Sequence, residues 1–179
     1  MGNLELCILQ TEEELIEFEK GLYEEFVEKE PNSWIVKNYE HIDGCRLKST
    51  IPYEYQKIYA VKKDGKIIMA AALNMNNKIR LKIEEMGFTL TEEQKNINFC
   101  EGLSLYIVKD CKENPFDLDI SLKKFYMEDL KKLGKTAIYG VCADKLLKLY
   151  LKFNFKILIK TFSEEENEYQ YLLRYDIPQ

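Results

Sequence analysis

Residues 57–75, KIYAVKKDGKIIMAAALNM, constrain the fold of this chain more than any other stretch. Two apolar runs flank the tetrapeptide Lys63-Asp64-Gly65-Lys66. An Asp-Gly pair between two such runs is the usual turn of a β-hairpin. The segment therefore predicts two adjacent antiparallel strands, and any fold for the chain must contain a sheet that includes them.

The rest of the chain predicts further strands and helices around this hairpin. Thr11 and Glu14 have the spacing of a capping box, which marks the start of a helix, and Gly134 marks the end of another. We interpret residues 76–98 as an insertion with a short strand and one helical turn, which makes it a candidate lid. Strands are expected at 4–10, 100–108, 136–142, 155–162 and 168–177, and helices after residue 11 and at 33–39, 118–133 and 144–153.

This order of elements predicts one domain over residues 1–179. The fold class is α/β (α+β), with a central mixed, mostly antiparallel sheet and helices on both faces. A chain of 179 residues has the usual length of a single domain. Strand edges near the C-terminus would also allow two copies to pair, so a homodimer is a possible assembly.

Charge and hydropathy exclude several classes of protein. The net charge of −5 argues against a general nucleic-acid binder, because phosphate neutralisation needs concentrated basic residues. No run approaches the roughly 20 apolar residues that span a bilayer, and the first residues lack a basic leader, so we expect a cytoplasmic protein. With five Cys in no paired spacing and one His, neither a disulfide framework nor a metal site is expected.

The charge is unevenly distributed along the chain. Residues 120–160 contain ten Lys against Glu128, Asp129 and Asp144. This basic stretch is suited to a phosphorylated ligand or to an acidic protein. The alternative is that these lysines form the solvated faces of two helices.

The piece TAIYGVCADKLLKLYLKFNFKIL resembles the end of the GNAT acyltransferase superfamily, where a helix finishes with a tyrosine, a lysine and a glycine-phenylalanine pair. Tyr150, Lys152, Asn154 and Phe155 fill those positions here. Asn154 replaces the glycine, and asparagine tolerates a left-handed backbone better than most residues. The resemblance implies the GNAT fold and transfer of an acyl group, typically acetyl, from acyl-CoA to an amine.

Members of that superfamily usually hold the pyrophosphate of CoA in a glycine-containing loop at a helix N-terminus. By resemblance the donor contacts here are Asn114, Phe116, Leu118 and Asp119. Asp117 and Asp119 stand where glycines are usual. These carboxylates either cap the helix or deny its positive end to a phosphate; we favour capping, and both interpretations oppose ordinary CoA binding.

Some relatives without the glycine motif, such as acyl-homoserine lactone synthases and N-acyl amino acid synthases, are associated with acyl-carrier-protein donors. CEGLSLYIV loosely resembles their strand that begins with a glutamate, here Glu101. An acidic carrier protein would suit the Lys-rich second half of this chain.

The resemblance also assigns catalytic roles. Tyr150 is the candidate acid that protonates the leaving thiolate, and Glu101 is the candidate base that acts on the amine. The backbone around Ile107 and Val108 would contact the pantetheine arm of the donor and donate to the oxyanion. Each side chain has a structural alternative: Tyr150 as plain core, and Glu101 as a solvated residue at a strand end.

The function that follows is that of an acyltransferase, with acetyl-CoA or another acyl-CoA as donor, no metal, and the amine of a small molecule or protein as acceptor. Two alternatives stay open. One is an acyl-carrier-protein-dependent acyltransferase, and the other is a non-catalytic binding module that has lost the CoA loop.

Overall fold

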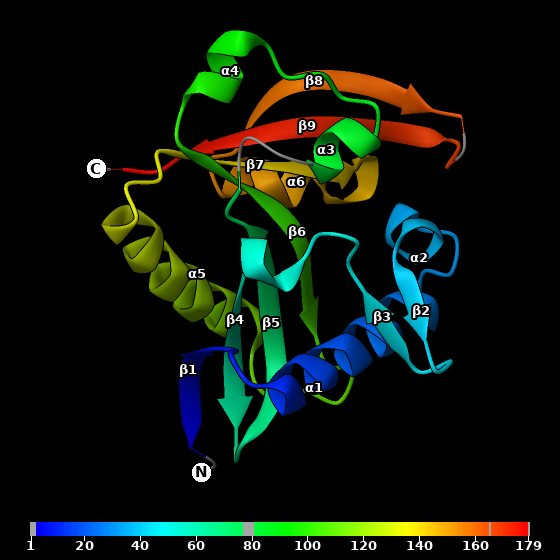
Figure 1. The fold of residues 1–179 in the computed structure, drawn as a ribbon, viewed down its shortest axis with the longest axis vertical. Coiled ribbons are helices and arrows are strands. Elements are labelled where there is room, and N and C mark those ends of the chain that lie inside the picture. The colour runs from blue at the N-terminus through cyan, green and yellow to red at the C-terminus, as the bar shows by residue number, and fades with distance from the viewer. Residues whose placement is uncertain (1–2, 77–80, 165, 179) are drawn as a thin grey trace. The chain divides into compact units, whose positions relative to one another are not determined.

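The computed structural model describes residues 3–76, 81–164 and 166–178 of the chain, and its largest feature is a seven-stranded sheet (Figure 1). A separate pair of strands, β2 (Glu40–Ile42) and β3 (Arg46–Lys48), is antiparallel. The order in the main sheet is β1 (Leu4–Ile8), β4 (Gln56–Lys63), β5 (Lys66–Asn74), β6 (Phe99–Ile107), β7 (Ala137–Ala143), β9 (Glu168–Asp176) and β8 (Lys156–Ser163).

Pairing in this sheet is mostly antiparallel. β1 with β4, β7 with β9, and β8 with β9 are antiparallel, whereas β6 and β7 are parallel. The 57–75 hairpin is present as β4 and β5, with Asp64 and Gly65 at positive φ in its turn. The mixed, mostly antiparallel α/β sheet that the order of elements predicted is confirmed.

By its contacts the chain divides into two compact units. Met1–Ala72 and Ser104–Glu128 form the first unit, and Leu73–Leu103 and Asp129–Gln179 form the second. Among the helices of the described residues, none combines the length and apolarity needed to cross a membrane.

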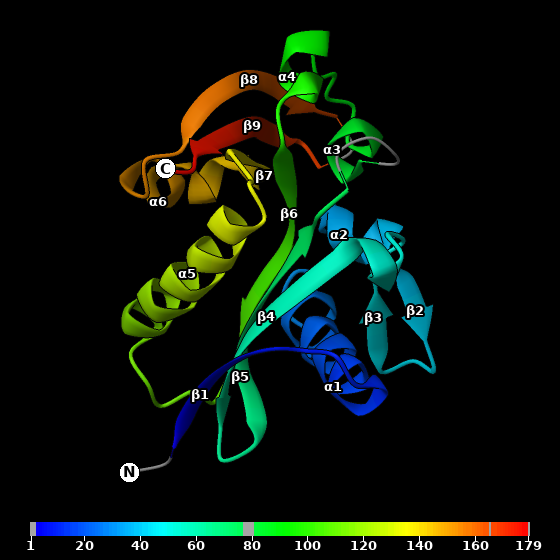
Figure 2. The ribbon, with the colours of Figure 1, turned by 60° about the vertical axis from the view of Figure 1, so that its left-hand side comes forward.

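In the first unit, helices pack on both faces of the sheet (Figure 2). On one face Phe18 of α1 packs on Tyr106 of β6, with ring centroids 5.8 Å apart. On the other face Tyr59 of β4 packs on Phe125 and Tyr126 of α5. The helical elements of this unit are α1 (Glu12–Leu22), its continuation η1 (Tyr23–Val27), α2 (Trp34–Asn38), the short turn η2 (Tyr53–Tyr55) and most of α5 (Pro115–Lys132).

The capping box at the start of α1 is confirmed. The hydroxyl of Thr11 accepts from the N–H of Glu14, and the carboxylate of Glu14 accepts from the N–H of Thr11. Glu14 also pairs with Lys62 of β4 at 2.5 Å. Hydrogen bonds from backbone N–H groups, together with Lys62, lower the pKa of Glu14 to about 2, so its charge holds α1 to the sheet over the ordinary pH range.

In the second unit, two apolar clusters cover the strands. In one cluster, apolar side chains from residues 81–90, including Phe88, pack on Phe99 of β6 and Tyr139 of β7. The other consists of Cys142, Tyr171 and Leu173, with side chains of α6 packed on it. The helices of this unit are α3 (Lys82–Glu85), α4 (Glu92–Asn96) and α6 (Asp144–Lys152).

Residues 76–98 differ from the expected insertion. Their described part contains the two short helices α3 and α4, and Leu81, Ile83, Phe88 and Leu90 are buried in the core. The expected short strand falls partly on residues 77–80, which lie outside the described residues. The described part is a covering layer of the second unit, because its apolar side chains pack on the sheet.

Asn154 has a left-handed backbone, with φ of 64°, just after α6. This confirms the expected role of asparagine in place of glycine. We expect Asn154→Gly to change the free energy of unfolding by less than about 0.5 kcal/mol, and Asn154→Ala to lower it by about 1 kcal/mol, because alanine adopts this conformation at higher cost. Urea denaturation of both variants measures the difference. An alanine variant as stable as the asparagine protein would contradict the argument.

Candidate active site

Glu101, the candidate base, lies in β6 and is completely buried. Its carboxylate accepts hydrogen bonds from the side-chain amide of Asn74 at 3.0 Å and from the backbone N–H groups of Lys82 at 3.1 Å and Ile83 at 2.5 Å. Burial raises the pKa of Glu101, and these hydrogen bonds act against that rise. The alternative of a solvated strand-end residue is wrong; the role as base stays a prediction.

Lys82 brings a buried positive charge next to Glu101. Its side chain is 8% exposed, and its Nζ donates to the carbonyl oxygen of Leu103 at 2.7 Å. Burial lowers the pKa of Lys82 to about 8, and the negative charges of Glu101 and Glu166 oppose that shift. The hydrogen bond to Leu103 and the nearby negative charges compensate the burial of this ammonium, since an isolated charge would be costly in an apolar interior.

Ile107 and Val108, the candidate backbone donors, differ in what their N–H groups do. The N–H of Val108 donates to the carbonyl oxygen of Ile68 on β5 at 3.0 Å. Because backbone groups of successive strand residues point to opposite edges, the N–H of Ile107 points away from β5. On that edge the register with β7 extends only from Phe99 to Glu101 among the described residues. Of the two, Ile107 therefore has the N–H that points away from β5, and its role as an oxyanion donor stays a prediction.

The N-terminus of α5 offers few donors to a phosphate. Pro115 has no N–H, the N–H of Phe116 donates to the Asn114 side chain at 3.0 Å, and the N–H of Leu118 donates to the Asn114 carbonyl at 3.2 Å. Three of the first four helical positions thus have no N–H left for an anion.

The expected capping by Asp117 and Asp119 is wrong. The helix begins at Pro115, three residues before the expected Leu118, because proline is favoured at the first helical position. The side chain of Asn114 therefore makes the cap. Asp117 lies in the first turn, where its charge still opposes a phosphate, and burial raises the pKa of Asp119.

Tyr150, the candidate acid, lies in α6 and is half-buried. Its ring packs edge-on against Phe155, with centroids 5.1 Å apart, and it contacts the cluster around Tyr171. It therefore faces inward on α6, whereas Leu146 and Leu149 are exposed. This packing suits a structural tyrosine, and the half-exposed ring also suits a proton donor, so both interpretations stay open.

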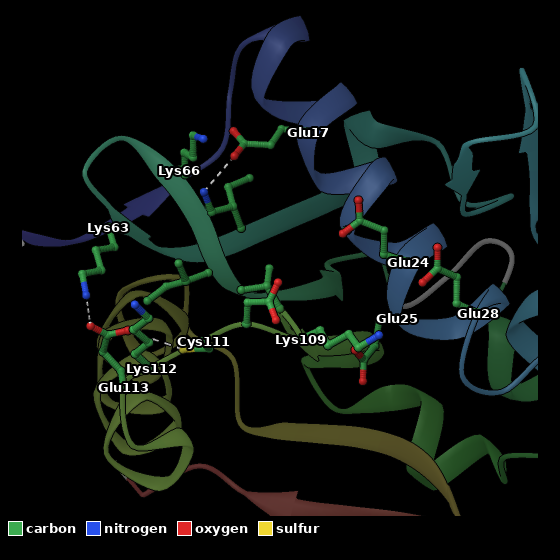
Figure 3. Close-up of a pocket in the computed structure, with 15 residues that line it drawn as sticks. Glu17, Glu24, Glu25, Glu28, Lys63, Lys66, Lys109, Cys111, Lys112 and Glu113 are labelled. Carbon is green, nitrogen blue, oxygen red and sulfur yellow. Dashed lines mark hydrogen bonds and ion pairs between the residues drawn. The ribbon is translucent and has the colours of Figure 1, made fainter.

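A cavity of about 760 Å³ lies in the first unit, between the α1–η1 helix and the loop that follows β6 (Figure 3). Glu17, Gly21, Glu24 and Glu28 line it from one side, at the spacing of a single helical face. The opposite side is formed by residues 66–68 at the start of β5 and residues 108–113. Its volume is in the range of small-molecule sites.

The hydroxyl of Tyr106 lies at the cavity-lining face of α1. The residue is 3% exposed, and a Cβ on Gly21 would lie 2.3 Å from its Oη. In the described part of the chain this hydroxyl forms no hydrogen bond, and its oxygen is not one of the fully buried polar atoms that lack a partner, so it keeps some exposed surface. Burial raises the pKa of Tyr106, and the negative charges of Glu17 and Glu24 raise it further.

The structure thus brings together some of the predicted residues and separates others. Ile107 and Val108 adjoin the cavity, because Val108 lines it. Glu101 belongs to the network with Asn74 and Lys82, and Tyr150 belongs to a different cluster. Within the described ranges, no group of three His, Cys, Asp or Glu side chains is arranged to hold a metal ion.

Sequence reasoning missed Lys82 and Tyr106. Lys82 sits between Leu81 and Ile83, and a lysine between two apolar residues is a weak signal of burial. Gly21 was the available signal for Tyr106, because a glycine inside a helix indicates close packing.

No family model matches the chain, and no curated protein matches it in sequence. Solved structures do match. The acyl-homoserine lactone synthase LasI has a TM-score of 0.77 at 12% identity, over 99% of this chain and 92% of that chain. For BjaI, a CoA-dependent acyl-homoserine lactone synthase, the TM-score is 0.74 at 13% identity, over 99% of this chain and 85% of that chain. For an N-acetyltransferase from Staphylococcus aureus, the TM-score is 0.63 at 14% identity, over 98% of this chain and 99% of that chain. At these identities the similarity establishes architecture, and the chain therefore has the GNAT fold.

Proposed function

We propose that the chain is an acyltransferase that moves an acyl group from a thioester donor to the amine of a small molecule. The observation that carries the proposal is the N–H of Ile107 at the open edge of β6, next to Val108, which lines a cavity of small-molecule size. A donor site needs an N–H where negative charge develops on the carbonyl oxygen. The shared fold supports the same conclusion by analogy.

The reaction requires two proton transfers. The ammonium group of the acceptor first loses a proton, and its nitrogen then attacks the thioester carbonyl to form the C–N bond. The C–S bond breaks as the tetrahedral intermediate collapses, and the second amine proton ends on the thiolate. In this proposal Ile107 donates to the oxyanion and Glu101 is the base for the first proton. Tyr150 gives its proton to the thiolate and regains one from the amine nitrogen, so that the second amine proton is the one transferred overall.

The donor is either acyl-CoA or an acyl carrier protein. One of the similar structures contains isopentyl-CoA with SAM, which supports CoA by analogy. The N-terminus of α5, with few free N–H groups and with Asp117 in its first turn, favours the carrier protein. On α6 the exposed side chains of Lys145, Lys148 and Lys152 alternate with exposed Leu146, Leu149 and Leu151. Such a surface suits an acidic helical partner.

Thermal denaturation with CoA, acetyl-CoA, longer acyl-CoAs and acyl carrier protein tests the donor, because any ligand of the native state raises the melting temperature by mass action. Release of free thiol in the presence of amines tests the transfer. A higher melting temperature with acyl-CoA identifies acyl-CoA as the donor. A higher melting temperature with the carrier protein alone identifies acyl carrier protein as the donor. No thiol release with either donor and any amine would reject the enzyme and leave the non-catalytic module.

Tyr150→Phe is expected to lower turnover about tenfold without changing the melting-temperature rise that the donor causes, because a thiolate leaves readily even when its proton comes from water. The matched control is Tyr169→Phe, which removes a hydroxyl from an exposed tyrosine of β9. Equal turnover in the wild type and both variants would remove Tyr150 from the mechanism and support its structural interpretation.

A further inference from the structure

The charges that line the cavity of the first unit differ in whether the protein already satisfies them. Glu17 accepts the N–H of Ile67 at 2.9 Å, and Lys63 pairs with Glu113. Glu25 pairs with Lys29. These charges already have partners within the protein.

Other charged side chains on the same walls have no such ion pair. Glu24 and Glu28, on the helical side, form no ion pair within the described ranges of the chain. The same holds for Lys66, Lys109 and Lys112 on the opposite side, again counting described residues only. Figure 3 shows Glu17, Glu24, Glu25 and Glu28 on the helical side, and Lys63, Lys66, Lys109 and Lys112 together with Glu113 on the β5 and loop side. Asp110 also lines the loop side without an ion pair among the described residues. The helical wall is therefore negative, and the opposite wall has a net positive charge, with four lysines against Asp110 and Glu113.

The hydroxyl of Tyr106 is a second, independent feature of this cavity. The residue is buried, but its oxygen is not among the fully buried polar atoms that lack a partner, so the hydroxyl keeps some exposed surface. The Tyr106 hydroxyl has no hydrogen-bond partner in the described part of the chain, and it lies against Gly21 on the lining face of α1. A polar group of a bound molecule would satisfy it.

We propose that this cavity binds a small zwitterion, with its ammonium group on the side of Glu24 and Glu28 and its anionic group on the side of Lys66, Lys109 and Lys112. Carboxylates attract the ammonium, and lysines attract a carboxylate or a phosphate as point charges. The Tyr106 hydroxyl forms a hydrogen bond with a polar group of the same molecule.

That this zwitterion is the acyl acceptor rests on the proposed function. Val108 lines the cavity, and Ile107, its neighbour in the chain, has the N–H that points away from β5. The ammonium group is the one that would be acylated after losing a proton. Binding itself does not depend on acyl transfer and is tested without a donor.

Titration calorimetry with each of the free amino acids and with phosphoethanolamine tests the binding, since these probes combine an ammonium with a carboxylate or with a phosphate. For an amino acid, the methyl ester keeps the ammonium without the carboxylate, and the N-acetyl derivative keeps the carboxylate without the ammonium. For phosphoethanolamine, ethanolamine keeps only the positive charge and N-acetylphosphoethanolamine keeps only the negative charge. We expect both derivatives to bind about tenfold more weakly or worse, because each loses one of the two charge contacts. A phosphate preference identifies the anionic group, and a carboxylate preference identifies the alternative.

Variants locate the binding in the cavity. Glu24→Gln/Glu28→Gln is expected to raise the Kd of the tightest probe about tenfold or more, and Lys109→Met/Lys112→Met to do the same. The matched control is Glu12→Gln/Glu13→Gln, which removes the same charge from exposed positions of α1 outside the cavity. Tyr106→Phe keeps the ring and removes only the hydroxyl, so it should weaken binding by a few-fold without unfolding the protein.

Two outcomes overturn the inference. One is that no zwitterion binds at concentrations up to about 10 mM, where even a weak site would be detected. The other is that the cavity variants and the control bind equally well. Thiol release distinguishes this result from a failure of the proposed function. If a zwitterion binds in the cavity but is never acylated, the binding site is supported and the acceptor role is rejected. If acylation occurs and the cavity variants do not affect it, acyl transfer is supported and the cavity is rejected as the acceptor site.

Discussion

Glu101→Gln is expected to lower the free energy of unfolding by about 2–4 kcal/mol, because a buried carboxylate that accepts several hydrogen bonds is replaced by a group that cannot accept them all. The three groups around this carboxylate are all donors, from Asn74, Lys82 and Ile83. A glutamine side chain would turn its own N–H₂ toward at least one of them. It would also remove the negative charge of Glu101, which favours the charged form of the buried Lys82.

Urea denaturation at neutral pH measures this loss. Glu93→Gln is the matched control, because Glu93 is exposed on α4, and its change should stay within about 0.5 kcal/mol. The double variant Glu101→Gln/Lys82→Met removes both buried charges and should recover part of the loss. A single variant as stable as the control would contradict the hydrogen-bond network. A large loss means that reduced activity of Glu101→Gln cannot by itself assign the base.

Gly21→Ala is expected to destabilise the protein by about 2 kcal/mol, although alanine is favoured over glycine in a helix by about 1 kcal/mol. The added Cβ would lie 2.3 Å from Oη of Tyr106 and 2.4 Å from Cζ of its ring. Tyr106 is 3% exposed and packs on Phe18, so its rigid ring has little room to move. The steric cost therefore exceeds the gain in helix propensity.

A double-variant cycle isolates this contact. In a Tyr106→Leu background, Gly21→Ala should become neutral or stabilising, because the atoms that crowd the new methyl group are gone. Lys20→Ala, at the exposed neighbouring position of α1, should change the free energy of unfolding by less than about 0.5 kcal/mol. If Gly21→Ala destabilises equally in both backgrounds, the cause lies elsewhere than in Tyr106.

Local signals were enough to predict most of the fold. The Asp-Gly turn predicted the hairpin, the Thr11 and Glu14 spacing predicted the start of α1, and Asn154 predicted a left-handed residue after α6. Each of these depends on a few neighbouring residues, whose backbone preferences are intrinsic.

The site was harder to predict because it depends on contacts between distant segments. Glu101 is buried because residues 74 and 82–83 supply its hydrogen bonds, and no local pattern indicates that partnership. The two aspartates predict a later start for α5 than the structure has, because the Asn114-Pro115 pair is the stronger local signal. The cavity needs α1, β5 and the loop after β6 together, and their sequences contain only common surface charges.

β8 is the last strand in the sheet order, so one of its edges has no partner strand among the described residues. Ile157 and Phe162 of this strand are exposed, and Lys156 and Lys160 are also exposed. Exposed apolar side chains on an outer strand favour aggregation, and lysines on such a strand oppose it by repulsion between copies. Lys156 pairs with Asp176 at 2.7 Å, so the repulsion between copies comes mainly from Lys160. Because salt screens that repulsion, we expect the solubility of the protein to fall as ionic strength rises.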